Sequence, residues 1–170
     1  MLRTTLAKSY IKRTIRPLYG WTQATPKSQF LDPAWNGVVP IYPGMAMMKT
    51  VGDAVTVLDG TGTPYGLSAF YEGGDGIFEI SEQGVNACAV WVLGPDAEFE
   101  ILSPAFDPAL AWAEPVNGTL AEVHAYTTGA MRGVLCLAGT SGASSLPVAK
   151  LIKVVSSTKI VIGGLTGRNV

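Results

Sequence analysis

The chain has 170 residues, 48% of them hydrophobic and 15% charged, and two cysteines, which excludes a disordered protein and a disulfide-framework protein. Its formal net charge of −1 is the sum of three blocks of alternating sign. Residues 1–49 carry seven bases and one acid, and residues 50–131 carry twelve acids and no base. Residues 132–170 carry five bases and no acid. Blocks of opposite sign attract one another, so the chain can bind its own copies, or a partner, at both ends, which indicates assembly rather than chemistry on a small substrate.

Residues 1–35 are predicted to form an extended N-terminal arm, because Pro17, Pro26 and Pro33 break the segment into extended pieces. Its basic residues interrupt every apolar stretch, so it does not fit a secretory signal, and although it is similar in composition to an organelle transit peptide, we expect it to be retained. Basic and aromatic side chains alternate along it and are expected to dock on a partner, the alternative being that they pack on the chain's own domain. These expected contact residues are Arg3, Lys8, Lys12, Arg13, Arg16, Trp21, Phe30 and Trp35.

Residues 36–105 are predicted to form a compact acidic β domain, because glycines and prolines recur at short intervals and suit short strands joined by turns. Glu98 and Glu100 alternate with Phe99 and Ile101, which is the pattern of a half-buried strand with a solvated or partner-facing acidic face. The expected strands are 45–50, 54–58, 65–71, 77–81, 87–93 and 97–102.

Residues 106–170 are predicted to form a C-terminal β region that follows a proline-rich connector at 103–118. Strands are expected at 120–127, 133–138, 148–155 and 159–162, with Lys150 and Lys153 facing water. No apolar run approaches the ~20 residues that a membrane-spanning helix needs. The predicted fold class is therefore all-β, a small β-barrel or β-sandwich domain with an extended arm and a C-terminal β subdomain.

The sequence shows no catalytic or cofactor-binding pattern, and no metal ligand set. The single histidine, His124, lies in a predicted strand without a second histidine or a cysteine beside it, so we expect it to face solvent or to bond to the backbone. A less favoured hypothesis, an enzyme or ligand-binding β-barrel, would use His124, Asp75 and Glu98. Cys88 and Cys136 lie among apolar residues and are expected to be buried reduced thiols, with an intramolecular bridge as the alternative.

A Pro43-Gly44 strand start, a strand unit ending at Asp59-Gly60, the segment Pro64-Tyr65-Gly66-Leu67 and an apolar strand and turn at 90–100 follow one another in the central region. This succession resembles the head decoration (cement) proteins of tailed bacteriophages. The resemblance implies a small β domain that docks on the outer capsid surface, commonly as trimers, with an arm that adds a strand to a capsid sheet. Residues 106–170 have no counterpart in the smallest such proteins.

We therefore expect a structural virion protein that stabilises a bacteriophage capsid by bridging subunits of the major capsid protein, and that is not an enzyme. It is expected to form homotrimers, and to bind no cofactor, no membrane and no nucleic acid directly, since its acidic block would repel phosphate. The alternative is a subunit of another symmetric assembly, such as a tail tube or a surface layer. The sequence leaves open whether the arm contacts the capsid or a neighbouring copy.

Overall fold

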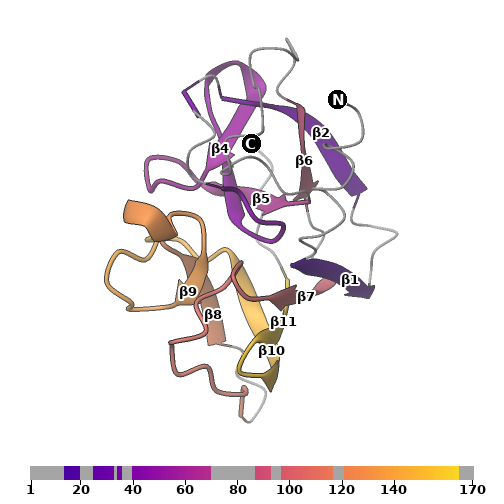
Figure 1. Ribbon diagram of the computed structural model, residues 1–170, viewed down its shortest axis with the longest axis vertical. Coiled ribbons are helices and arrows are strands. Elements are labelled where there is room, and N and C mark those ends of the chain that lie inside the picture. The colour runs from indigo at the N-terminus through magenta and orange to yellow at the C-terminus, as the bar shows by residue number, and fades with distance from the viewer. Residues whose placement is uncertain are drawn as a thin grey trace.

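The computed structural model describes residues 14–19, 25–32, 34–35, 40–69, 87–92, 97–116 and 121–164. Within these ranges the chain forms eleven strands and two short 3-10 turns, arranged as a closed barrel and a six-stranded sheet. Figure 1 shows the barrel strands in the upper half of the molecule and most strands of the sheet below them. The all-β prediction is confirmed.

The barrel is closed by five strands in the order β2-β4-β3-β5-β6. Strand β2 completes the ring, because it pairs antiparallel with β6 along most of its length and parallel with β4 at Phe30↔Ala54 and Leu31↔Val55. The tight turn between β3 and β4 uses positive φ angles at Gly52 (76°) and Asp53 (62°). The strands are β2 (Thr25–Leu31), β3 (Ala46–Lys49), β4 (Ala54–Val57), β5 (Pro64–Ser68) and β6 (Ala87–Val92).

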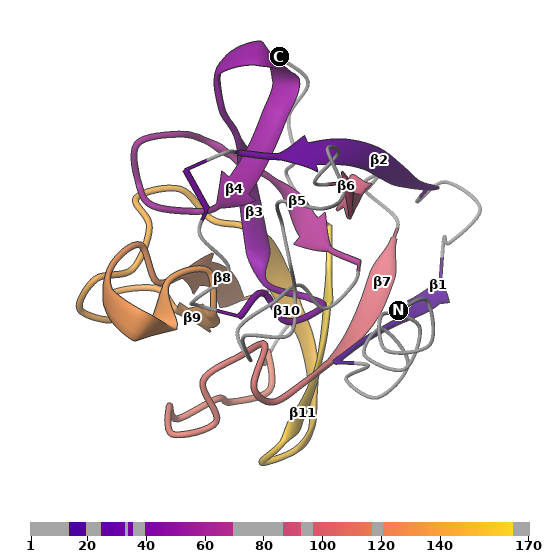
Figure 2. The same ribbon diagram turned by 45° about the horizontal axis from the view of Figure 1, so that its top comes forward.

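The second sheet has the order β1-β7-β11-β10-β8-β9, and all its neighbouring strands are antiparallel. Figure 2 shows β1 beside β7, and β10 and β11 running together beneath the barrel. The strands are β1 (Ile15–Tyr19), β7 (Glu98–Leu102), β8 (Ala121–Ala125), β9 (Leu135–Leu137), β10 (Ala149–Ser156) and β11 (Lys159–Gly163).

One hydrophobic core joins the barrel to the sheet. Met45 and Leu58 from the barrel side belong to the same buried cluster as Phe99 of β7 and Leu151 of β10. The backbone connects the two parts as well, because the Ala46 N–H donates a 2.8 Å hydrogen bond to the Gly133 carbonyl. The two sheets therefore pack as one body.

The strands expected from 45 to 58 and from 120 to 162 lie where the sequence predicts them, with shifts of at most two residues at their ends. Lys150 and Lys153 are exposed, as expected. The expected strand 77–81 lies outside the described residues, and the described part of the connector forms turns.

The described part of the expected arm is built into both sheets. Strand β1 pairs with β7 of the six-stranded sheet, whereas β2 is one of the strands that form the barrel. Strand β7, from the expected central domain, lies between β1 and the C-terminal strand β11. The division into 1–35, 36–105 and 106–170 stays a prediction, and strand pairing crosses each of its boundaries.

Candidate partner-binding surfaces

The structure describes three of the eight expected contact residues, and it gives them different environments. Arg16 is on β1, Phe30 is on β2, and Trp35 follows β2. The other five lie outside the described residues: Arg3, Lys8, Lys12, Arg13 and Trp21.

Arg16 pairs with an acid of its own chain. Its guanidinium Nη2 lies 3.1 Å from Glu100 Oε2, and Lys159 Nζ lies 3.5 Å from Glu100 Oε1. The Glu100 side chain is only 11% exposed, whereas that of Arg16 is 63% exposed. Glu100 is therefore neither solvated nor free for a partner, but Arg16 keeps much of its surface available.

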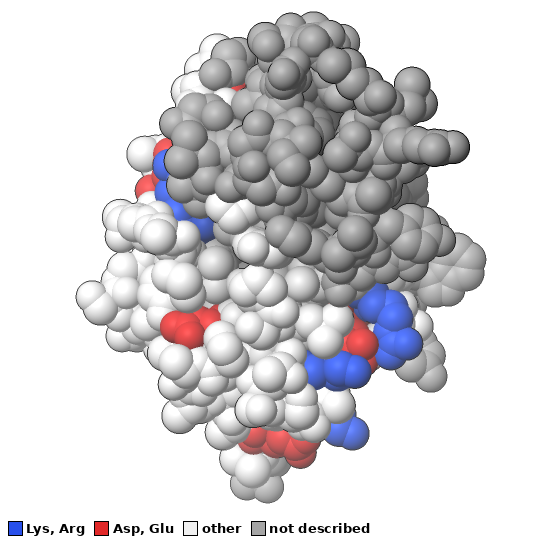
Figure 3. Space-filling view, in the orientation of Figure 1, with Lys and Arg blue, Asp and Glu red and all other residues white. Residues whose placement is uncertain are grey.

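The three charge blocks meet in the six-stranded sheet. The first block contributes Arg16 on β1, the acidic block contributes three acids on β7 and β8, and the last basic block contributes three lysines on β10 and β11. Lys150 is in register with Glu122, just as Arg16 is with Glu100. Figure 3 shows acidic and basic side chains interspersed on the lower half of the molecule. Part of the charge segregation is therefore satisfied between strands of one chain.

Two exposed apolar side chains lie at one end of the barrel, and we call them the barrel-end surface: Phe30 and Val51. Phe30 is 58% exposed and is paired with Ala54, at the start of β4. Val51 is 98% exposed and lies on the turn that leads into Ala54. Lys49 and Asp53 flank the turn and form a 2.9 Å ion pair, so the barrel-end surface has a polar margin.

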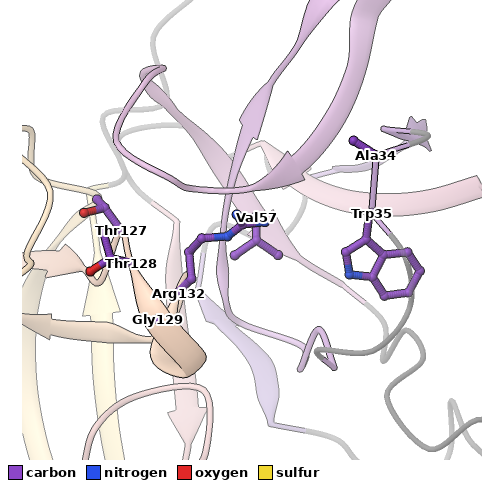
Figure 4. A pocket seen from close by; sticks show the side chains of 7 residues that line it. All are labelled: Ala34, Trp35, Val57, Thr127, Thr128, Gly129 and Arg132. Carbon is purple, nitrogen blue, oxygen red and sulfur yellow. The ribbon is translucent and has the colours of Figure 1, made fainter.

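Trp35 is buried, with 6% of its surface exposed, and belongs to the core. It also lines a pocket of about 480 Å³ between the barrel and the connection from β8 to β9, which we call the Arg132 pocket (Figure 4). Arg132 forms no ion pair with an acid among the described residues. The lining residues are Ala34, Trp35, Val57, Thr127, Thr128, Gly129 and Arg132.

Sequence reasoning missed Arg132, because no local motif marks it. Its only signal is its place as the first base after the acidic block. The pocket combines segments that lie far apart in the chain, so its composition follows from the pairing of the strands rather than from any short pattern.

The structure describes two of the three residues of the enzyme hypothesis, His124 on β8 and Glu98 on β7, and strands β11 and β10 lie between them in the sheet. His124 is buried in β8, where Nδ1 donates a 2.6 Å hydrogen bond to the Ser144 carbonyl and Nε2 lies 3.4 Å from Glu122 Oε2. This confirms the predicted strand histidine bonded to the backbone. Glu98 is half-buried on β7, and Asp75 lies outside the described residues. The described ranges hold no group of three or more His, Cys, Asp or Glu side chains placed to bind a metal ion.

Both cysteines are buried and neither forms a disulfide, so the prediction of reduced thiols is confirmed. Burial raises the pKa of the Cys136 thiol to about 12, and Asp107 adds to the shift. In the part of the chain that the structure describes, no helix has the length and apolar character needed to cross a membrane.

A family model described as phage cement protein matches residues 1–166, which include every strand of both sheets. No curated protein and no solved structure matches the chain significantly. Phage cement proteins are structural components of the virion that stabilise the capsid. The match confirms the resemblance drawn from the sequence, and the chain belongs to the phage cement protein family.

Proposed function

We propose that the protein binds the outer surface of a bacteriophage capsid as a homotrimer and bridges neighbouring subunits of the major capsid protein, without contacting nucleic acid. Membership of the phage cement family supports a capsid-stabilising role. The proposed binding mode is based on the exposure of Phe30, an expected contact residue. Its side chain is 58% exposed at the same end of the barrel as Val51, which is 98% exposed. Aromatic side chains that are accessible in the free protein commonly anchor interfaces.

The barrel-end surface would supply the apolar part of this contact. Complete burial of one large apolar side chain contributes roughly 1.5–3 kcal/mol, so Phe30 and Val51 together can anchor a capsid contact. The ion pair of Lys49 with Asp53 at the margin suits a polar rim around that anchor.

The basic residues would supply attraction to an acidic capsid surface. Arg16 is exposed enough to bind a second carboxylate while it keeps Glu100. Trp21 stays an expected contact, whereas the burial of Trp35 assigns it to the core in the free protein. The four basic residues that precede β1 complete the proposed set: Arg3, Lys8, Lys12 and Arg13.

Decoration of purified capsid shells that lack this protein tests the proposal. We expect Phe30→Ser to weaken binding at least tenfold, since the lost anchor is worth more than ~1.4 kcal/mol. Val155→Ser is the matched control, because Val155 is 47% exposed on β10 of the other sheet and should bind like the wild type. Equal occupancy by the wild type and Phe30→Ser would remove the barrel-end surface from the mechanism.

Deletion of residues 1–13 tests the basic part of the arm. This deletion removes Arg3, Lys8, Lys12 and Arg13 and leaves β1 and β2 intact, whereas deletion of 1–35 would remove a strand from each sheet. We expect a folded protein whose capsid binding is weaker and less sensitive to salt, because exposed charges are screened. Wild-type affinity and salt dependence in the deletion variant would contradict a role for these bases.

Bridging and trimer formation need separate measurements. Shells decorated by a bridging protein should rupture at a higher temperature than bare shells, and sedimentation of the free protein reports its oligomeric state. Decoration without a rise in rupture temperature would contradict bridging, and a monomer both free and on shells would contradict the trimer.

A further inference from the structure

We propose that the Arg132 pocket binds an aspartate or glutamate side chain of the capsid protein, as a contact separate from the barrel-end surface. The inference rests on the proposed function for the identity of the partner, and on the pocket itself for the chemistry of the bound group. Figure 4 shows the Arg132 side chain extending from the β8–β9 connection towards Val57, with Trp35 on the far side of the pocket.

The charge balance of the pocket favours a carboxylate. Arg16 and Lys159 are matched by Glu100, and Lys49 is matched by Asp53. Arg132 has no acid within ion-pair distance in the part of the chain described, and unlike the exposed Lys27, Lys150 and Lys153, which also have none there, it is half-buried and lines a hollow. A half-buried guanidinium without a carboxylate can gain a bidentate partner from another molecule.

The walls of the pocket strengthen such a pair. Val57 is 3% exposed and Trp35 is 6% exposed, so the barrel side of the pocket is an apolar wall. A charge-assisted hydrogen bond is stronger beside apolar groups than in open water, because the local dielectric is lower. Thr127 and Thr128 line the opposite side, where the Thr127 hydroxyl donates to the Gly142 carbonyl, and the volume of about 480 Å³ has room for a side chain and a stretch of its backbone.

The lining disfavours nucleic acid as the ligand. Arg132 is the one base among the seven described residues that line the pocket, whereas proteins that follow a phosphate backbone gather several bases in one groove. A single arginine beside an apolar wall matches one carboxylate on a protein surface.

The test measures the decoration of capsid shells by Arg132→Gln, Arg132→Lys and the wild type. We expect Arg132→Gln to bind about tenfold to a hundredfold more weakly, the usual range for a lost charge-assisted hydrogen bond. Arg132→Lys should recover only part of the affinity, because lysine cannot form the planar bidentate pair. Lys153→Gln, which removes an exposed base on β10, should bind within about twofold of the wild type.

A second measurement uses glutarate as a probe and follows the amide signals of the free protein by nuclear magnetic resonance. Saturable shifts at Thr127, Thr128 and Gly129 that disappear in Arg132→Gln support the site. Their absence, or the same shifts in the variant, overturns it. If glutarate binds but the wild type does not decorate shells, the proposed capsid function fails while carboxylate binding stands.

The identity of the partner is tested by sedimentation of the same variants. Unchanged decoration by Arg132→Gln overturns the capsid assignment. If that variant instead loses self-association, the carboxylate belongs to a second copy of the chain. If Arg132→Gln unfolds at the same temperature as the wild type, any loss of binding in this variant is not caused by a loss of folding.

Discussion

Tyr126 donates a 2.7 Å hydrogen bond from its phenol to Asp107 Oδ2 and thereby ties the end of β8 to the connector after β7. Asp107 also accepts the Ala109 N–H through Oδ1, and its carbonyl accepts the Trp112 indole N–H at 2.7 Å. The backbone N–H of Asp107 donates to the Leu135 carbonyl of β9. Asp107 therefore holds the proline-rich connector by several hydrogen bonds, together with Ala105, whose carbonyl accepts the Leu135 N–H.

Replacement of Tyr126 by phenylalanine should lower the free energy of unfolding by about 1–2 kcal/mol, because it removes a hydrogen bond to a charged acceptor. Tyr65→Phe is the matched control, since the Tyr65 phenol only accepts a long 3.4 Å contact from Gln29 Nε2. Denaturant unfolding of both variants measures the difference. Equal effects would mean that the Asp107 bond adds nothing to stability.

The same bond predicts a loss of stability at alkaline pH. Burial, with the Asp107 bond, raises the pKa of Tyr126 from 10.0 to about 12. The folded state thus keeps the proton while the unfolded state loses it, so this contribution is complete below pH 10 and is lost as pH rises towards 12. Unfolding temperatures of the wild type should fall more steeply over this range than those of Tyr126→Phe. Parallel curves would contradict the assignment.

Gly133 should tolerate no side chain. Its φ is +83°, and an added Cβ would lie 2.2 Å from Val57 Cγ1, where the β8–β9 connection meets the barrel. We expect Gly133→Ala to cost at least ~3 kcal/mol, the sum of left-handed strain and overpacking. Gly139→Ala has a similar φ of +77° and open space around it, so it should cost only about 1–2 kcal/mol. Thermal unfolding compares the two variants.

The carboxylate of Glu100 should contribute to stability through both of its basic partners. Glu100→Gln is expected to lower the free energy of unfolding by about 1–2 kcal/mol, less than a fully buried pair, because Arg16 is largely exposed. The effect should shrink in 1 M salt. Asp53→Asn should leave stability unchanged within error, because the Asp53 side chain is 83% exposed in its ion pair with Lys49. Equal effects of the two substitutions would show that the burial of Glu100 is irrelevant.

Local pattern was enough to predict most strands. The segment 54–58 was expected and β4 covers Ala54–Val57, while 159–162 was expected and β11 covers Lys159–Gly163. Such strands consist of alternating or continuous apolar residues between turns rich in glycine and proline, so they can be predicted before their partner strands are known.

Strands β1 and β2 were predicted only as extended arm pieces, because Pro17, Pro26 and Pro33 break the segment. Strand β1 is an edge strand of its sheet, where a missing N–H does no harm. At Pro26, β2 pairs with Trp91 of β6, and its pairing with β4 begins only at Phe30. Pro17 and Pro26 are therefore compatible with strands, but only the long-range pairing reveals it.

The environments of Trp35, Glu100 and Arg132 could not be predicted from the local sequence pattern either. Glu100 is surrounded by bases from both ends of the chain, and Trp35 is buried once the barrel closes. The exposure of Phe30 was consistent with its expected role, since the sequence offered no local core to cover it.

The position of β1 also constrains the order in which the chain can fold. Arg16 and Glu100 are separated by 84 residues, and the whole barrel lies between them in the sequence. Strand β1 has no partner in its sheet until β7 has left the ribosome, whereas every barrel strand has been synthesised by then. The barrel can therefore close first, and its closure brings β1 to the place where β7 will arrive, which shortens the search for the most distant pairing in the sheet.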